Sequence, residues 1–263
     1  MKYILVTGAC GGMGQKAVER LAAQGFGVLA LDKKEGRAAE RVFPLEADIT
    51  DEDSLKEALA KVRMITPKLY AIVHYAGIYR MDSLIEMERV DFEQIVSINL
   101  TGAFLVNRTF SPLLRPGSRI VITTSELAPL DPLPFTGIYA VTKAALDKYA
   151  YSLRMELQLL DISVSVLRAG AVKTGMLGVS TAALDHFCEK TKRYSCNAER
   201  FRQIVNRVEA RSIPPERIAE KTERILRCRR PRFAYSINRN PLLLLLNGLP
   251  KRLQLWAIRQ VLK

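Results

Sequence analysis

The chain has 263 residues, of which 48% are hydrophobic and 25% charged, a composition that excludes disordered, collagen-like and disulfide-scaffold proteins. Four scattered cysteines without a C-x-x-C pair and two histidines argue against a Cys/His metal site and favour a reducing, cytoplasmic compartment. The formal net charge of +13 points to an anionic partner, and no stretch approaches the roughly 20 apolar residues of a transmembrane helix. Only four apolar residues follow residues 1–2 before a glycine-rich stretch, so we expect no secretory signal.

Short apolar runs alternate with helical patterns along the first 170 residues. We predict strands at 3–6, 27–31, 71–73, 119–124 and 162–167, and helices at 14–24, 54–62, 92–110 and 138–159. Strands separated by helices of this length imply right-handed crossovers and a parallel sheet. The pattern therefore predicts an α/β fold, a doubly wound parallel sheet with helices on both faces, followed by a C-terminal helical, basic extension.

A glycine-rich turn at residues 7–14 directly follows the first predicted strand and begins the first predicted helix. Its sequence fits T-G-x-x-x-G-x-G, with four glycines within seven residues. Glycines at such a junction permit a tight turn and close approach of the backbone to a pyrophosphate, which the helix N-terminus then stabilises. A purely structural turn is the alternative. The position favours a Rossmann-like dinucleotide site that includes Gly8, Gly12, Met13 and Gly14.

Two acidic residues follow the next apolar runs. Asp32 ends the second predicted strand, where a carboxylate accepts hydrogen bonds from the adenosine ribose hydroxyls and repels a 2′-phosphate. This favours NAD, although Lys33, Lys34 and Arg37 follow at once and could neutralise the phosphate of NADP. Asp48 follows a third short run and is a candidate for the adenine edge of the site, with a loop or helix-cap carboxylate as the alternative.

Three residues indicate proton-transfer chemistry. Tyr139 and Lys143 are four residues apart near the start of a predicted helix, so they share one face. An ammonium one turn away favours a phenolate and lowers the pKa of a tyrosine toward the working range of a general acid or base. Ser125 ends a strand 14 residues before Tyr139, at the sheet edge where parallel sheets bind ligands. An aromatic core residue beside a solvated lysine is the alternative for the pair.

Together these motifs resemble those of the short-chain dehydrogenase/reductase family of the single-domain type, over about residues 1–175. The matching positions, in the family's order, are Thr7-Gly8-x-x-x-Gly12-x-Gly14, Asp32, Asp48, Ala76-Gly77, Asn99, Ser125, Tyr139-x-x-x-Lys143 and Gly170-x-Val172-x-Thr174.

The resemblance implies a role for each residue of the site. Tyr139 would be the catalytic acid and base, and Lys143 would bind the nicotinamide ribose and tune Tyr139. Ser125 would hold the substrate oxygen, and Asn99 would position a water in the proton relay, with a helix-interior polar residue as its alternative. The cofactor would also be lined by Ala76, Gly77, Gly170, Val172 and Thr174.

The chain departs from the family pattern at three places. Residues 74–75 are His-Tyr where Asn-Asn is usual, and a hydrogen-bonded sheet histidine is favoured there over a catalytic base. Residues 169–170 are Ala-Gly in place of Pro-Gly, which loosens that turn. The gap between Ser125 and the tyrosine is one residue longer than usual, so Thr124 and Glu126 are alternatives for the serine's role.

Residues 175–212 correspond to the lid over the family's substrate pocket. An apolar wall could come from Met176, Leu177, Leu184, Phe187, Tyr194 and Phe201. Ordinary helix packing explains most of these side chains equally well, so they identify no substrate.

The charge excess lies entirely in the last part of the chain. Residues 1–187 hold 21 basic and 21 acidic residues, whereas residues 188–263 hold 19 basic and 6 acidic ones. Residues 224–263 carry ten basic residues, no acid, many leucines and Trp256. This combination suits peripheral contact with an anionic membrane. Packing of the leucines on a subunit or on the domain is the alternative, and a nucleic-acid partner is disfavoured because no motif supports it.

We therefore predict one dehydrogenase domain at residues 1–237 and a basic, leucine-rich tail at 238–263. Residues 230–236 also resemble the retinol- and hydroxysteroid-dehydrogenase branch, which implies a lipophilic alcohol or ketone such as a steroid, retinoid or long-chain lipid. The family resemblance implies a homodimer or homotetramer formed through 92–110 and 138–159. The predicted function is NAD(P)-dependent interconversion of an alcohol and its carbonyl. The alternatives are a soluble carbonyl or 3-oxoacyl-thioester reductase and a non-catalytic dinucleotide-binding scaffold.

Overall fold

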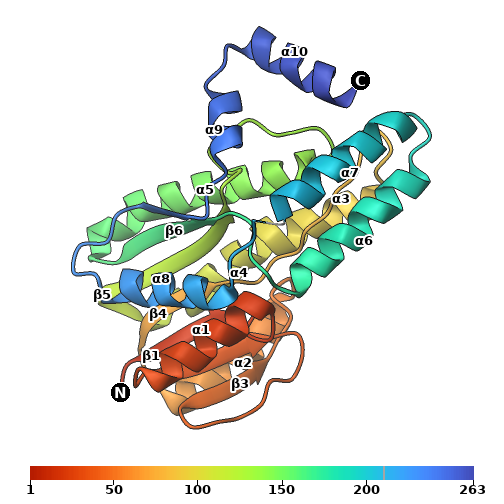
Figure 1. Cartoon of the computed structure of the whole chain (residues 1–263). Coiled ribbons are helices and arrows are strands. Elements are labelled where there is room, and N and C mark those ends of the chain that lie inside the picture. The colour runs from red at the N-terminus through yellow and green to blue at the C-terminus, as the bar shows by residue number, and fades with distance from the viewer. Residues whose placement is uncertain (210) are drawn as a thin grey trace.

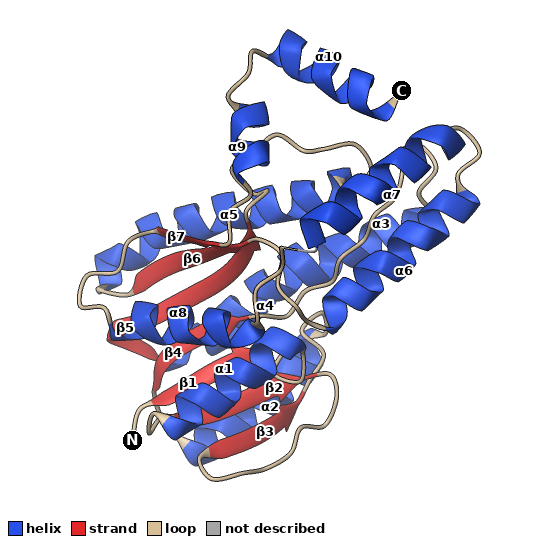
Figure 2. Ribbon diagram, in the orientation of Figure 1, coloured by secondary structure: helices blue, strands red, loops and turns tan. Residues whose placement is uncertain are grey.

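The computed structural model describes residues 1–209 and 211–263, without the side chains of 176–183 and 207–209. The described residues form a seven-stranded parallel sheet in the order β3-β2-β1-β4-β5-β6-β7 (Figures 1 and 2). The strands are β1 (Tyr3–Thr7), β2 (Gly27–Asp32), β3 (Val42–Glu46), β4 (Leu69–His74), β5 (Leu114–Ser125), β6 (Ser163–Ala169) and β7 (Ala234–Ile237). The strand order reverses between β1 and β4, which is where doubly wound sheets bind ligands. The predicted fold is confirmed.

Helices cover both faces of the sheet, as the continuous apolar strands require. On one face lie α1 (Gly12–Ala23) and α8 (Pro215–Arg227), and on the other lie α2 (Glu52–Ile65), α4 (Gly102–Phe110) and α5 (Gly137–Leu157). Each face buries its own apolar cluster, one built on the α1 and α8 side chains and the other on those of α2, α4 and α5.

The helix predicted at 92–110 is a composite in the structure. It consists of α3 (Arg89–Val96), a π-helical segment η1 (Ser97–Thr101) and α4 in direct succession. Apolar periodicity does not reveal such a segment, because the chain keeps its helical course while the hydrogen bonds change from i→i+4 to i→i+5. Short 3₁₀ segments, η2 (Ser111–Leu113) and η3 (Gln158–Leu160), follow α4 and α5.

The C-terminal third belongs largely to the domain itself. The lid predicted at 175–212 contains α6 (Gly175–Lys190) and α7 (Ser195–Glu209), which project together beyond the carboxyl end of the sheet (Figure 1). The chain then returns to the sheet: α8 packs beside α1, and β7 pairs with β6 as the edge strand. Periodicity predicted none of these four elements.

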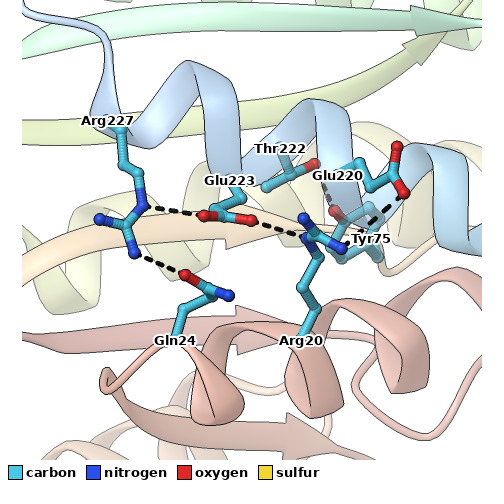
Figure 3. A network of polar contacts seen from close by, with 7 residues as sticks. All are labelled: Arg20, Gln24, Tyr75, Glu220, Thr222, Glu223 and Arg227. Atoms are coloured by element: carbon cyan, nitrogen blue, oxygen red, sulfur yellow. Dashed lines mark hydrogen bonds and ion pairs between the residues drawn. The ribbon is translucent and has the colours of Figure 1, made fainter.

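A polar network joins α8 to α1 and to the end of β4 (Figure 3). The Glu223 carboxylate accepts hydrogen bonds from Arg20 Nε at 2.7 Å and from Arg227 Nε at 2.9 Å. The hydroxyls of Tyr75 and Thr222 share a hydrogen bond of 2.5 Å. Tyr75, one of the two positions that depart from the family pattern the sequence resembles, thereby fastens the end of β4 to α8.

His74 at the end of β4 is fully enclosed in the sheet. Its Nε2 shares a 2.9 Å hydrogen bond with Asn107 Oδ1 on α4, and burial lowers the pKa of the imidazole to about 4. The ring is therefore neutral at physiological pH. The prediction of a hydrogen-bonded sheet histidine is confirmed.

Two helices follow β7, α9 (Pro241–Asn247) and α10 (Lys251–Leu262), and they stand at the top of Figure 1. The buried face of α10 packs on the lid, where Leu262 joins a cluster with Leu184 and Phe201. No helix among the described residues is long and apolar enough to cross a bilayer.

The ten cations of residues 224–263 do not form one surface. Five belong to α8 and the loop that enters β7, at the amino end of the parallel strands: Arg224, Arg227, Arg229, Arg230 and Arg232. The other five follow β7 at the carboxyl end: Arg239, Lys251, Arg252, Arg259 and Lys263. They form one group in the sequence because they are close together in the chain. In the structure the length of β7 separates the two sets.

Candidate active site

Two adjoining cavities open at the carboxyl end of the sheet. The larger cavity, of about 730 Å³, lies over the glycine turn and the ends of β1, β2 and β4. The smaller cavity, of about 220 Å³, lies over the ends of β5 and β6 and reaches Phe201 on α7. Met13, Tyr79 and Thr174 line both cavities, so these residues mark the junction.

The glycine turn forms the floor of the larger cavity. Gly8 has a φ of +68°, and a Cβ there would lie 2.5 Å from the Ala76 nitrogen. A Cβ on Gly12 would lie 2.8 Å from the Thr174 side chain, and one on Gly14 would collide with the Gly8 carbonyl. Among the described residues no side chain caps α1, and its first turn has no acid. The positive end of the helix is thus available to an anion, as a pyrophosphate requires.

Both acidic residues predicted to bind the cofactor line this cavity. Asp32 accepts hydrogen bonds from the backbone nitrogens of Cys10 at 2.9 Å and Lys34 at 3.1 Å, which fix its carboxylate at the cavity edge. Asp48 accepts from Lys33 Nζ at 2.8 Å and from Thr50. Burial raises the pKa of Asp48, but these hydrogen bonds outweigh burial and lower it to about 2.

The proton-transfer residues meet at the smaller cavity. Ser125 at the end of β5 and Tyr139 in the first turn of α5 both line it, and against the effect of burial the Ser125 hydroxyl lowers the pKa of Tyr139. Lys143 lies one turn further along α5, with Nζ 5.7 Å from the centre of the Tyr139 ring. Thr124 also lines this cavity, but its hydroxyl donates to Asp147 Oδ1 at 3.3 Å. The geometry therefore favours Ser125 over Thr124 as the partner of the tyrosine.

Asn99 on the π-helical segment ties this group to the larger cavity. Its Oδ1 accepts from Ile78 N at 2.8 Å, and its Nδ2 donates to Ile78 O at 3.0 Å and to Thr142 Oγ1 at 3.2 Å. A Cβ on Gly77 would lie 3.1 Å from Asn99 Oδ1 and 3.4 Å from Lys143 Nζ. The absence of a side chain at Gly77 thus lets the amide and the ammonium lie directly beneath the backbone of the larger cavity.

Burial shifts the proton affinity of both members of the pair. It raises the pKa of Tyr139 to about 12, against the opposing hydrogen bond from Ser125, and lowers the pKa of Lys143 to about 8. Lys143 Nζ donates to the Thr123 carbonyl at 3.4 Å. Near neutral pH the tyrosine is therefore a proton donor, and the lysine is a cation whose charged form is destabilised by burial.

The remaining predicted residues divide between the two cavities. The larger one is lined by Ala76 and Gly77, and the smaller one by Gly170 and Val172, with Thr174 at the junction. Of the predicted lid wall, Phe201 lines the smaller cavity, whereas Leu184, Phe187 and Tyr194 pack inside the lid or against Phe135. Met176 and Leu177 lie outside the residues whose side chains are described.

Sequence reasoning missed several residues that line the smaller cavity, among them Tyr79 and Leu243. The Tyr79 ring packs on Tyr139 with centroids 4.6 Å apart, and Leu243 enters from α9. Proximity to 76–77 could have drawn attention to Tyr79. Leu243 carried no signal in the sequence, because only the docking of α9 brings it to the cavity.

The low pKa of Lys143 predicts a pH-dependent stability effect. Replacement of Lys143 by Met should raise the free energy of unfolding near pH 7 by up to about 3 kcal/mol, because the native state no longer holds a poorly solvated cation. The advantage should shrink as pH rises from about 8 toward 10.5, where the native wild type has lost a proton that the unfolded chain retains. Urea denaturation of the nucleotide-free proteins measures both effects.

The matched control is Lys148→Met on the exposed side of the same helix, with an expected change within about 0.5 kcal/mol at every pH. A Lys143→Met advantage that stays constant with pH would contradict the assignment.

A family model described as short chain dehydrogenase matches residues 2–185. Estradiol 17-beta-dehydrogenase 2 of Mus musculus is 32% identical over 208 residues, 71% of this chain and 54% of that protein. The NADPH-dependent 1-acyldihydroxyacetone phosphate reductase of Schizosaccharomyces pombe is 28% identical over 192 residues, 69% of this chain and 65% of that protein. The chain thus spans between about half and two thirds of the length of these curated relatives.

The fold is also that of solved proteins. The crystal structure of a short-chain dehydrogenase from Streptomyces avermitilis superimposes with a TM-score of 0.78 at 18% identity, covering 99% of this chain and 96% of that one. A family model matched over most of the chain, the glycine turn and the Ser125, Tyr139 and Lys143 arrangement agree, and the chain belongs to the short-chain dehydrogenase family.

Proposed function

We propose that this protein is an NAD(P)-dependent oxidoreductase that interconverts an alcohol and its carbonyl. The observation that carries the proposal is the placement of Ser125 and Tyr139 together in a cavity that adjoins the glycine-floored one. The larger cavity fits a dinucleotide: its floor is a glycine turn packed too tightly to admit a Cβ, the start of α1 has no side-chain cap, and the Asp32 carboxylate lies at its edge. When bound, the nicotinamide would accept or supply the hydride.

The chain's own residues would hold the substrate oxygen and move its proton. Ser125 donates a hydrogen bond to that oxygen and orients it toward Tyr139. In reduction the Tyr139 hydroxyl gives its proton to the oxygen, and in oxidation the phenolate takes it back. Lys143 lies close enough to favour the phenolate electrostatically, and Asn99 braces the backbone between the two cavities.

The lining of the smaller cavity supports a lipophilic substrate. Side chains from the sheet edge, the lid and α9 contribute mostly apolar surface, including Leu127, Phe201 and Leu243. A steroid, a retinoid or a long-chain lipid suits such a lining, and one relative is named for estradiol.

Tyr139→Phe should reduce turnover at least about 100-fold while leaving nucleotide affinity within twofold, because the change removes only the proton-transfer hydroxyl. NADH and NADPH fluorescence should be followed against a panel of steroid, retinoid and acyl ketones and alcohols. Thr142→Ser, one turn away and retaining its hydroxyl, is the control for local packing. A Tyr139→Phe enzyme with most of the wild-type rate would rule out the assigned acid and base.

We further propose that NAD is the preferred cofactor. The Asp32 carboxylate lies at the cavity edge. The neighbouring Lys33 ammonium is paired with Asp48, which weakens its electrostatic attraction for a 2′-phosphate. Asp32→Ala should therefore shift the ratio of NADH to NADPH dissociation constants about tenfold or more toward NADPH. Fluorescence titration measures both constants, with the exposed Asp53→Ala as control. Tighter binding of NADPH than of NADH by the wild type would refute the preference.

The exposed faces of α4 and α5 support a homodimer or homotetramer. Large apolar side chains lie uncovered there, although the rest of both helices is well packed: Phe104, Val141, Tyr151 and Met155. A second copy that presents the same face would bury them in a symmetric interface.

We also propose peripheral contact with an anionic membrane through residues 238–263. Leu245 on α9 and Trp256 on α10 are 68% and 61% exposed, and Arg252 and Arg259 lie on the outer side of α10. Lys251 is paired with Asp131, so the surface charge is smaller than the sequence indicated. Apolar side chains flanked by cations suit the headgroup region of a bilayer.

Vesicle sedimentation tests the membrane contact. Arg252→Gln with Arg259→Gln should weaken binding to phosphatidylserine vesicles at low salt by about 2 kcal/mol. Added salt should abolish this difference between the variant and the wild type, because it screens the charges. Leu245→Ser with Trp256→Ser should remove a part that salt does not affect. The control pair is Arg224→Gln with Arg232→Gln, at the other end of the sheet. Equal loss in the control pair, or no sedimentation of the wild type at low salt, would exclude this surface.

A further inference from the structure

Glu126 is a carboxylate inside the smaller cavity, directly after Ser125. Its side chain belongs to a residue that is only 8% exposed. Among the described residues that line this cavity it is the only acid, and neither a lysine nor an arginine lines the cavity. An ionisable group in so apolar a lining costs free energy unless each oxygen has a partner.

The two carboxylate oxygens of Glu126 have different surroundings. Oε2 accepts a 2.6 Å hydrogen bond from the backbone nitrogen of Asn240, the residue that caps α9. Oε1 has no hydrogen bond among the described residues. It lies beside Gly170, where a Cβ would be only 3.0 Å from it, and Gly170 itself lines the cavity. One oxygen is thus committed to the protein, and the other remains available to a ligand.

Anchoring of α9 does not by itself require a carboxylate. The Asn240 nitrogen needs one acceptor, which a neutral glutamine would supply without a buried charge. Burial raises the pKa of Glu126, against the opposing Asn240 hydrogen bond and the Arg239 charge. The site therefore disfavours the ionised form of this carboxyl group. The second oxygen, next to the serine that would hold the substrate, is what distinguishes glutamate from glutamine at this position.

We propose that Glu126 is a specificity-determining residue whose Oε1 accepts a hydrogen bond from a second hydroxyl of the substrate, near the reacting carbon, and that its charge excludes anionic substrates. The assignment rests on the proposed alcohol–carbonyl chemistry of the same pocket. It narrows the substrate class to a neutral, largely apolar diol or hydroxyketone. A simple alcohol would leave Oε1 desolvated and unpaired, and a carboxylate at that position would face a like charge in a medium of low dielectric constant.

The same residue links selectivity to the C-terminal tail. Glu126 begins the loop between β5 and α5, which in Figure 1 runs beside α9. Further along this loop the Asp131 nitrogen donates to Asn247 Oδ1 at 2.8 Å, and the Asp131 carboxylate pairs with Lys251. Asp131 therefore contacts the tail as Glu126 does but does not line the cavity, which makes it a matched control.

The test compares three ligands of one carbon skeleton on the protein–NADH complex: cyclohexanol, trans-1,2-cyclohexanediol and cyclohexanecarboxylate. Dissociation constants come from the change in NADH fluorescence, so turnover is not needed. The wild type should bind the diol about tenfold more tightly than cyclohexanol and the carboxylate most weakly. Glu126→Gln should abolish the preference for the diol, tighten carboxylate binding about tenfold and leave cyclohexanol within twofold. The wild type, unlike Glu126→Gln, should bind the carboxylate more weakly as pH rises.

Asp131→Asn should leave the three ratios unchanged. Equal ratios in the wild type and Glu126→Gln, with or without a change in stability, would show that Glu126 only anchors Asn240, and failure of the wild type to bind the diol would also overturn the proposal. Oxidation of cyclohexanol and the diol with NAD separates this outcome from failure of the proposed function. If the alcohols are oxidised but the ratios of dissociation constants do not depend on Glu126, only the specificity role is rejected. If the ratios depend on Glu126 but neither alcohol is oxidised, only the proposed reaction is rejected.

Discussion

The burial of the Lys143 ammonium beneath Gly77 is the constraint around which the site is arranged. A lysine that is 6% exposed must be held by its surroundings: its ammonium donates to the Thr123 carbonyl, and both the ammonium and the Asn99 amide oxygen lie beneath Gly77. This arrangement depends on two special features of the backbone. One is the glycine at position 77, on the loop after β4, and the other is the π-helical segment that carries Asn99. The lysine is thereby fixed beneath the backbone of the larger cavity, with its Nζ 5.7 Å from the centre of the Tyr139 ring.

The tail completes the substrate side of this arrangement. Asn240 bonds Glu126, Leu243 enters the smaller cavity, and Leu262 closes the apolar cluster of the lid. The part of the chain that carries the charge excess therefore also shapes the pocket. A membrane that engages the outer side of α10 would act on a helix whose inner side already touches the lid, so surface attachment and access to the pocket share one element.

The edge of the sheet shows how composition can mislead about a surface. Ten basic residues without an acidic one indicate a single basic tail in the sequence. In the structure β7 separates them into two sets at opposite ends of the strands. Arg227 is bound to Glu223 in the contact between α8 and α1, and Lys251 is bound to Asp131. The electrostatic part of any membrane affinity consequently rests on fewer charges than their number in the sequence indicates.

The sequence by itself determined the parallel sheet, five of its strands (β1, β2, β4, β5 and β6) and the local motifs. Each of these follows from short-range constraints: apolar runs that must be buried, glycines at a strand–helix junction, and a tyrosine and a lysine one helical turn apart. It also favoured a hydrogen-bonded role for the histidine at position 74, because a polar group at the end of a buried strand needs a partner.

Tertiary structure alone decided what depends on contacts between distant segments. Local periodicity gives no sign of three such contacts: the pairing of β7 with β6, the Tyr75–Thr222 hydrogen bond across 147 positions and the hydrogen bond from the Asn240 nitrogen to Glu126. The π-helical turn at Asn99 is hidden for a related reason, since its hydrogen-bond shift leaves the apolar pattern intact. Glu126 could be read from the sequence only as a substitute for Ser125. Its own place in the pocket exists because α9 folds back over the loop that carries it.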